Sequence, residues 1–476
     1  MKQIAVVALG LVWLGASVSA AELWLGAATT DITPDRPVAL DGQFNTRISR
    51  KVETPLTASA VAIEAREGGR ATDQAVLVSL DIVAIRPPVL TAVRERLREK
   101  VPELDPRKLV LTATHTHTAP VTETGKYLIP TNNVMQPPEY VAFLADRVAG
   151  MIAQAWNSRQ PGGVSWALGS AAIAHNRRAL YASGKATMYG SISSNEFRGL
   201  ENGEDHALQT LFFWKRDGQP LAACIHVPCP AQEVEHLNAI NADYWHPARL
   251  RLRAALTNDL IILGWPGAGG DVSPHRMLRK AAEDRMLKLR GLTAVEDIGR
   301  RIAAEAADLF ALARRDVQTN PAFAHRVAEL ELPVRRVTEQ EVEDARKQIA
   351  KLKASGDTGR RGNWYQATVD RFQTQDQHPT WPTEIHVVRL GDIVIATNPF
   401  ELFHEYGDQI QGRSRALQTI VVQLTASSSG YLPTQRAVEG GGYSAVVQSS
   451  KVGPTGGQLL VDRTVELINS LWTAKP

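Results

Sequence analysis

The sequence lacks three features that would assign it to a common class of protein. Its 53 Lys and Arg and 50 Asp and Glu are mixed along 476 residues, without the one-face basic cluster typical of a nucleic-acid binder. After the first twenty residues no apolar run is long enough to cross a bilayer. The chain also has no H-E-x-x-H, G-x-S-x-G, Walker or G-x-G-x-x-G motif. We therefore expect no nucleic-acid partner, no membrane span and none of the enzyme classes that those motifs mark.

Cysteine is scarce as well. The only two, Cys224 and Cys229, lie in the segment CIHVPC. In an oxidising compartment this spacing permits a short-loop disulfide, and two thiols that flank a histidine also suit a soft metal ion. Buried or bridged cysteines are the simpler interpretation, and the spacing does not choose between a bridge and two free thiols.

The first twenty residues have the pattern of a secretory signal. Lys2 precedes an apolar run over residues 4–14, and small residues end at Ala20. The run is shorter than the ~20 residues that a membrane anchor needs. We expect residues 1–20 to be a signal peptide and residues 21–476 to be a single exported domain, secreted or periplasmic.

Periodicity predicts an α/β fold. Residues 73–85 and 108–113 read as buried strands, and residues 87–101 between them place apolar side chains at helical spacing. Strand, helix and strand in this order imply two parallel strands in one sheet. Ligands of such sheets gather beyond the carboxyl ends of the strands, so polar residues in these places are candidates for a site.

Other segments predict further helices and antiparallel strands. Helices are expected near 139–156 and over 293–315, the second opened by a capping box, and the polar segment 337–380 predicts a solvated helical excursion. Two pairs of apolar runs flank short turns and predict hairpins: residues 207–214 with 220–227, and residues 384–390 with 393–397. The mixture indicates mixed sheets flanked by helices.

Polar residues of catalytic type follow several predicted strands. The two histidines of THTHTAP, His115 and His117, come after the strand at 108–113. Other strand ends supply further residues of this kind: His226, Ser273, Glu401 and Tyr431. One such residue means little, but several strand ends that supply histidine, serine, glutamate and tyrosine predict one convergent site.

Spacing suggests how the histidines would act. In extended backbone residues i and i+2 point the same way, so we expect His115 and His117 to face one pocket, one as a metal ligand and the other as a hydrogen-bond or acid–base partner. Catalytic zinc takes histidine and carboxylate ligands and keeps a place for water, a set that His115, His226 and Glu401 would supply. Two satisfied polar residues in a loop are the simpler alternative, which the pattern alone favours.

Two more segments carry candidates with a simpler alternative. Glycines in GWPGAGGDVSPH would present Ser273 as an attacking hydroxyl or an oxyanion donor, but the segment also fits a tight turn in which Asp271 caps the following helix. Arg177 in HNRR would clamp a carboxylate, a phosphate or an oxyanion, or lie at the surface in a salt bridge.

Taken in order, these motifs resemble those of the neutral ceramidase family, zinc-dependent enzymes that hydrolyse the amide of N-acylsphingosine. THTHTAP is similar to the family's His-Thr-His-Ser-Gly-Pro, HNRR to Asn-Arg-Ser-Pro, GGDVSP to Gly-Asp-Val-Ser-Pro, and GY at 430–431 to a Gly-Tyr ahead of a second tyrosine. The likeness runs from GAATTDITPD to VGPTGG, over most of residues 21–476.

The resemblance implies a role for each of eight residues. The implied zinc ligands are four in number: His115, His226, Glu401 and Tyr431. The implied catalytic residues are Ser273 as nucleophile or transition-state group, with His117, Arg177 and Tyr443 around the reaction centre. Tyr443 follows Tyr431 by twelve residues, as the family spacing requires.

The chain also departs from the family. The segments APVTETGKY and LPTQRAVEGGGY differ from the family pattern where the substrate entrance would lie, and no C-terminal immunoglobulin-like domain is expected in this chain. We therefore expect an exported zinc amidohydrolase that acts on ceramide or another N-acyl lipid, with transient contact to a membrane surface and no obligate protein partner. The alternatives are the same zinc chemistry on an ester, another N-acyl compound or a modified glycan, and a non-catalytic binding protein on the same scaffold.

Overall fold

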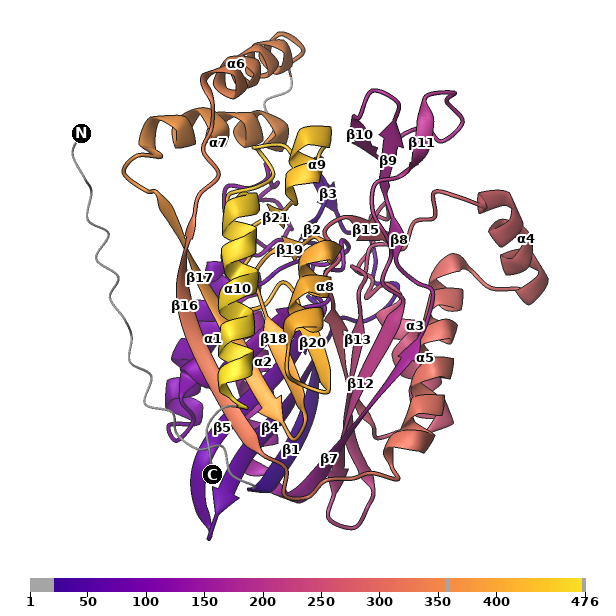
Figure 1. Ribbon diagram of the computed structural model, residues 1–476, viewed down its shortest axis with the longest axis vertical. Coiled ribbons are helices and arrows are strands. Elements are labelled where there is room, and N and C mark those ends of the chain that lie inside the picture. The colour runs from indigo at the N-terminus through magenta and orange to yellow at the C-terminus, as the bar shows by residue number, and fades with distance from the viewer. Residues whose placement is uncertain (1–20, 357–358, 473–476) are drawn as a thin grey trace.

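The computed structural model describes residues 21–356 and 359–472, and its largest element is a mixed sheet of eight strands (Figure 1). In order across the sheet these are β14 (Ile261–Pro266), β13 (Pro220–Val227), β12 (Ala207–Lys215), β7 (Gln160–Ser170), β1 (Glu22–Asp31), β4 (Thr57–Glu67), β5 (Arg70–Leu80) and β6 (Leu109–Ala113). The predicted strand–helix–strand unit is confirmed, because α1 (Pro87–Lys100) joins the parallel strands β5 and β6. The predicted signal peptide, residues 1–20, lies outside the described residues.

A second sheet of four strands packs face to face on the first. Its order is β16 (Phe323–Pro333), β17 (Thr380–Leu390), β18 (Ile393–Thr397) and β20 (Gln418–Val422). Both predicted hairpins are confirmed, since β12 pairs antiparallel with β13 and β17 with β18. Leu77 and Phe213 of the large sheet meet Val388 and Ile395 of the small one in a single buried cluster. The two sheets therefore enclose a core between them.

Helices cover the outer faces of both sheets (Figure 1). The large sheet carries α1, α2 (Pro137–Asn157), α3 (Trp245–Ala255) and α5 (Ala294–Ala313), and the small sheet carries α8 (His404–Arg413) and α10 (Pro454–Ser470). Alternation along each strand explains the layers: on β4, Ala60 packs on the helical side and Val61 on the side of the second sheet. The order helix, sheet, sheet, helix confirms the predicted α/β class with mixed sheets.

Short elements gather at one end of the two sheets, the upper end in Figure 1. They include the pairs β2 (Ala39–Leu40) with β3 (Arg47–Ile48), β8 (His175–Asn176) with β15 (Val272–Ser273), and β19 (Glu401–Leu402) with β21 (Tyr431–Leu432). A three-stranded sheet of β10 (Ala186–Met188), β9 (Arg178–Tyr181) and β11 (Phe197–Leu200) and the helix α9 (Gln435–Gly440) lie there too. The pairs bring together segments that are far apart in the sequence.

The predicted polar excursion and capping box are also confirmed. Between β16 and β17 the chain forms α6 (Glu339–Ala354) and α7 (Arg360–Thr374), which stand above the second sheet in Figure 1. At the start of α5, the backbone N–H of Thr293 donates to Glu296 Oε2 at 2.8 Å and the Glu296 N–H donates to Thr293 Oγ1 at 3.3 Å. The remaining helix, α4 (Lys280–Arg290), extends from the side of the molecule.

The two cysteines are free thiols in this structure. Cys224 packs in the core between the two sheets, whereas Cys229 packs under α3 and α5 on the other side of the large sheet. Since the two side chains point to opposite faces of β13 and its continuation, a bridge would require the backbone to move. The four residues between the two cysteines would permit a disulfide, but none is formed in this structure.

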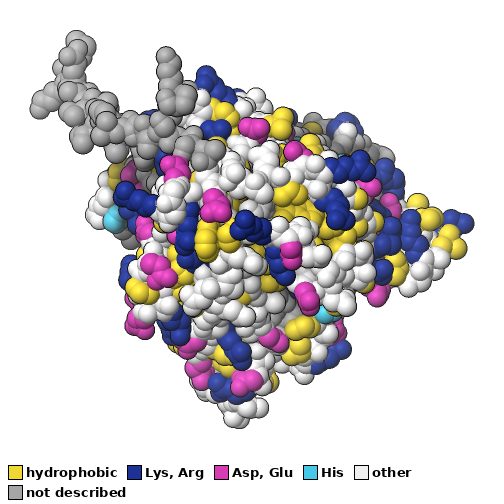
Figure 2. Space-filling model, turned by 90° about the horizontal axis from the view of Figure 1, so that it is seen from below, with side chains coloured by type: hydrophobic (Ala, Val, Ile, Leu, Met, Phe, Trp, Pro, Cys, Tyr) yellow, Lys and Arg dark blue, Asp and Glu magenta, His cyan; other side chains and the backbone are white. Residues whose placement is uncertain are grey.

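Charges of both signs are interspersed on the face that Figure 2 shows, at the end opposite the short elements. Among the described residues no helix has the length and apolar character needed to cross a bilayer.

A buried histidine pair on the neighbouring strands β16 and β17 predicts a pH effect on stability. His325 Nε2 lies 3.0 Å from His386 Nδ1, and burial together with the charge of His386 places the pKa of His325 well below its usual value. Because the unfolded chain then binds protons more readily than the folded one, the free energy of unfolding should fall as pH drops below about 6.5, with a slope that approaches about 1.4 kcal/mol per pH unit. Urea unfolding of wild type and His325→Gln between pH 7.5 and 5 checks this. The variant should show the flatter profile, and parallel profiles would contradict the assignment; His378→Gln, at an exposed histidine, is the control.

Candidate functional site

A cavity of about 320 Å³ lies among the short elements at the upper end of the sheets. Six of the eight predicted site residues line it: His115, His117, Arg177, Glu401, Tyr431 and Tyr443. They come from the segment after β6, the link from β8 to β9, the paired strands β19 and β21, and the segment after α9. The structure therefore brings most of the candidates to one place, although their roles stay predictions.

His115 occupies a left-handed backbone conformation, with φ of 69°. Its N–H donates to Ile82 O at 3.0 Å, and its ring Nδ1 lies 2.7 Å from Val83 O. Such a conformation in a non-glycine residue is uncommon and costs free energy that the surrounding contacts must offset. The extended backbone expected for this segment is thus wrong, yet both histidines still face the same cavity because the left-handed turn redirects the chain.

The protonation of His115 follows from its contacts. Since Val83 O can only accept, Nδ1 of His115 carries the proton and Nε2 presents its lone pair to the cavity. Burial, and then the charge of His117, lowers the pKa of His115 to about 4, so its ring is neutral at neutral pH. A neutral histidine whose other nitrogen donates to a backbone carbonyl has the arrangement usual for metal-ligating histidines.

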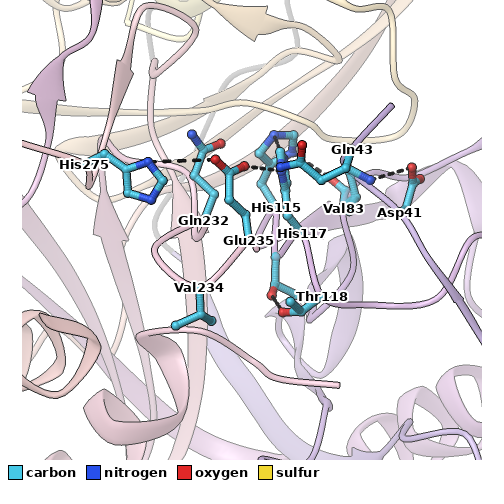
Figure 3. Close-up of polar contacts among 12 residues, drawn as sticks. Asp41, Gln43, Val83, His115, His117, Thr118, Gln232, Val234, Glu235 and His275 are labelled. Atoms are coloured by element: carbon cyan, nitrogen blue, oxygen red, sulfur yellow. Dashed lines mark hydrogen bonds and ion pairs between the residues drawn. The ribbon is translucent and has the colours of Figure 1, made fainter. Parts of the chain in front are cut away.

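His117 lies between His115 and a carboxylate (Figure 3). Its Nε2 is 3.1 Å from His115 Nε2, and its Nδ1 is 2.8 Å from Glu235 Oε2. On the far side of this carboxylate, His275 Nδ1 lies 3.8 Å from Glu235 Oε1. Burial raises the pKa of Glu235, but the hydrogen bond and charge of His117 outweigh it and lower the pKa to about 2, so Glu235 is ionised at neutral pH.

Glu401 and Tyr431 are direct partners in the short parallel pair β19–β21, which places them side by side. Glu401 Oε2 is 3.7 Å from His115 Nε2. Arg177 Nη2 donates to the Tyr431 hydroxyl at 3.2 Å and to Gly270 O at 2.9 Å. Burial, and then the charge of Glu401, raises the pKa of Tyr431 well above its usual value, so the hydroxyl keeps its proton in this arrangement.

The other two predicted residues, His226 and Ser273, do not line the cavity. His226 Nε2 donates to Val421 O at 2.9 Å, and its Nδ1 is a buried atom that has no hydrogen-bond partner in the described part of the chain. Ser273 is fully buried in β15, where its hydroxyl accepts from the His275 N–H at 3.2 Å. Their predicted roles as ligand and nucleophile gain no geometric support here.

The glycine-rich segment GWPGAGGDVSPH had a simpler alternative, a turn in which Asp271 caps the following helix, and this alternative is partly confirmed. Asp271 Oδ1 accepts from the N–H of His404, the first residue of α8. The aspartate therefore caps a helix, as the alternative required, but a helix that begins 133 residues further along the chain.

Sequence reasoning missed Glu235 and Gly42. Glu235 lies in QEVEH, a segment without an apolar pattern, and only its contact with His117 distinguishes it. Gly42 has φ of 101°, and a β-carbon there would lie 2.4 Å from His117 Cγ, so the turn that contains it can approach the histidine only as glycine. The segment DGQFN offered a turn signal, but nothing in it indicated proximity to His117.

A zinc ion fits part of the predicted ligand set. Among the described residues, no three His, Cys, Asp or Glu side chains are grouped so as to hold a metal ion. His115 Nε2, an unprotonated ring nitrogen, nevertheless lies 3.7 Å from the Glu401 carboxylate, and Tyr431 lies beside Glu401. These donors suit zinc, and His226 stands outside the group.

Solved structures with the same fold support the resemblance in the sequence. The chain superposes on a structure described as neutral ceramidase from Pseudomonas aeruginosa with a TM-score of 0.68 and 18% identity, over 95% of this chain and 75% of that one. A structure described as ceramidase complexed with C2 superposes with a TM-score of 0.67 and 18% identity, over 95% and 76%. No protein-family profile and no curated protein matches the chain. The fold is therefore ceramidase-like.

Proposed function

We propose that the protein hydrolyses the amide bond of an N-acyl substrate with a zinc ion held by His115, Glu401 and Tyr431. The observation that carries the proposal is the convergence of these three donors with His117 and its carboxylate partner Glu235 in one cavity. The shared fold with neutral ceramidases supports it. Export of residues 21–476 is part of the proposal and is supported by the signal pattern in residues 1–20.

The residues around the three donors have the chemistry that amide hydrolysis needs. A bound zinc ion would polarise the scissile carbonyl and lower the pKa of a water molecule. Arg177 is 3% exposed and carries a fixed positive charge beside Tyr431, so it can stabilise negative charge that develops on the carbonyl oxygen. The Tyr443 hydroxyl is a second donor in the cavity, because burial raises the pKa of Tyr443 to about 12 and keeps it protonated.

His117 is placed to move the proton. Its ring lies between the ionised Glu235, whose Oε2 is 2.8 Å from Nδ1, and His115, whose Nε2 is 3.1 Å from the Nε2 of His117. A proton on Nε2 can pass to the leaving amine while Glu235 holds the ring in place. Addition of water and cleavage of the C–N bond then give a carboxylate and an amine. Ser273 and His226 take no step in this scheme, because neither lines the cavity.

Metal removal tests the proposal. The purified protein should contain about one zinc ion per chain, lose hydrolysis of N-lauroylsphingosine after dialysis against a chelator, and recover it when zinc is returned. The measurements are elemental analysis and a fluorescent amine assay, with N-lauroyl esters and N-acyl sugars in parallel. Full activity without bound metal would overturn the proposal. Turnover of an ester or a sugar alone would support the zinc chemistry and change the substrate.

A further inference from the structure

The cavity has a second polar end that the proposed chemistry does not use. Three cationic side chains line this end: Arg86, Lys126 and Arg360. They come from the residue before α1, the segment between β6 and α2, and the first residue of α7. The side chains of Arg86 and Lys126 are only 18% and 11% exposed, so these charges are largely removed from water.

Among the residues that the structure describes, one buried carboxylate opposes these cations. Asp41, whose side chain is 3% exposed, accepts from Lys126 Nζ at 2.6 and 2.9 Å, and Arg86 Nη2 lies 3.8 Å from it. Arg360 instead donates to Gln43 O and to the Tyr127 hydroxyl. The second carboxylate, Glu123, is 3.8 Å from Arg86 Nε, and its side chain is 45% exposed. Positive charge therefore exceeds negative charge at this end of the cavity.

The excess of positive charge affects two of these side chains, Lys126 and Arg86. Burial, and then the charge of Arg86, lowers the pKa of Lys126 to about 7 in spite of its contact with Asp41. Arg86 Nε is a buried atom with no hydrogen-bond partner in the part of the chain that the structure describes. A buried donor without a partner and a crowded set of cations both cost free energy, which an anionic group of a ligand would offset.

Aromatic rings connect this end to the reacting centre. The Arg360 guanidinium lies 5.2 Å from the ring centre of Phe44, the rings of Phe44 and Tyr443 are 5.7 Å apart, and the rings of Tyr443 and Tyr431 are 5.8 Å apart. Trp364 packs against both Phe44 and Tyr443. A substrate that spans the cavity would thus pass two aromatic rings between the proposed metal ligands and the cations.

We propose that Arg86, Lys126 and Arg360 form a subsite for an oxyanion, a carboxylate, sulfonate or phosphate, that belongs to the substrate of the cleaved amide. This inference rests on the proposed function, and it narrows the substrate from N-acyl compounds in general to anionic ones such as N-acyl amino acids. The planar guanidinium of an arginine suits an oxyanion, with which it forms two parallel charge-assisted hydrogen bonds. Ceramide carries no charge and would leave the excess positive charge of these cations uncompensated.

A matched pair of substrates tests the subsite. N-Lauroylglycine and N-lauroylethanolamine share an acyl chain and differ in a carboxylate against a hydroxyl, so kcat/KM should be at least about 10-fold higher for the glycine compound. The N-butyl monoamide of dodecanedioic acid carries its carboxylate on the acyl side and shows which half of the substrate reaches the cations. Equal kcat/KM for charged and neutral substrates would overturn the inference.

Variants connect the preference to the cations. Arg360→Met and Arg86→Met should each lower kcat/KM for N-lauroylglycine about 10-fold more than for N-lauroylethanolamine. Lys126 is not replaced, because the buried Asp41 carboxylate would then lose its closest positive charge. The matched control is Arg361→Met: this exposed arginine also lies near the Phe44 ring, at 5.0 Å, but does not line the cavity. A preference that survives both Arg360→Met and Arg86→Met would contradict the assignment.

Calorimetry separates this inference from the proposed function. If the protein hydrolyses no amide, the proposed function fails, and binding of the same two compounds to the metal-free protein decides the subsite. Tighter binding of N-lauroylglycine than of N-lauroylethanolamine, reduced in Arg360→Met and unchanged in Arg361→Met, would support it. Equal affinities would overturn it.

Discussion

Replacing His115 with alanine is expected to remove the bound zinc and to lower amide hydrolysis by at least about 10³-fold. The proposed metal acts as a Lewis acid worth several kcal/mol at the transition state, and each ~1.4 kcal/mol corresponds to a factor of ten in rate. His115 Nε2 is the only nitrogen lone pair that the described residues present to the Glu401 carboxylate within 3.7 Å. Zinc content and kcat/KM for an N-lauroyl amide, measured on the same preparation, check the result.

Two further histidines sharpen this experiment. His378→Ala changes an exposed histidine that does not line the cavity and should leave zinc and activity intact. His226→Gln tests whether His226 is a zinc ligand, as the resemblance implies, or only donates a hydrogen bond to Val421 O, as in this structure. Loss of zinc in His226→Gln would show that its ring turns toward the metal. Retention of zinc and activity in His115→Ala would contradict the proposed centre.

Replacing Arg249 with methionine is expected to lower the free energy of unfolding by about 3–5 kcal/mol. Arg249 on α3 donates from Nη1 and Nη2 to Asp81 at 2.6 and 2.9 Å, and the two side chains are 4% and 0% exposed. The variant would leave a carboxylate buried without its cation. Asp81 also accepts a hydrogen bond from Thr114, the residue before His115. Removing the ion pair should therefore also destabilise the turn that carries His115. Urea unfolding followed by fluorescence measures the change.

The control for this prediction is an exposed pair of the same chemistry. Arg463 lies 2.7 Å from Glu466, and these side chains are 55% and 61% exposed. Arg463→Met should therefore change the free energy of unfolding by at most about 1 kcal/mol, because water screens the pair. Asp81→Leu in the Arg249→Met background should recover part of the loss, since no unpaired charge remains. Equal effects of the two single variants would refute the buried pair as the cause.

Local signals predicted much of the fold. Apolar runs marked β5, β12, β13, β17 and β18, and the Thr293–Glu296 capping box marked the start of α5. These signals are reliable because they depend on neighbours within one strand or one helical turn. The same locality explains why the sequence left a bridge and two free thiols open at the cysteines: spacing reports how far apart two residues are along the chain, but not that Cys224 and Cys229 face opposite sides of a sheet.

The residues of the candidate site were likewise only partly predictable from local signals. Placement after a strand indicated His115 and Arg177, and the resemblance added Tyr443, all three of which line the cavity. His226 and Ser273 were selected by the same reasoning and lie outside it. A strand end tells where a residue leaves the sheet, whereas the direction of its side chain depends on the pairing of short strands such as β8 with β15.

By itself, the sequence determined the α/β class, the strand and helix order, and a set of polar residues at strand ends, because each follows from patterns within a few residues. Only the tertiary structure decided which of those residues share a cavity, that His115 adopts a left-handed conformation, and that Glu235 supports His117. It also placed Arg86, Lys126 and Arg360 around one carboxylate. Such contacts join segments up to hundreds of residues apart, and the packing of the two sheets, rather than any local pattern, brings them together.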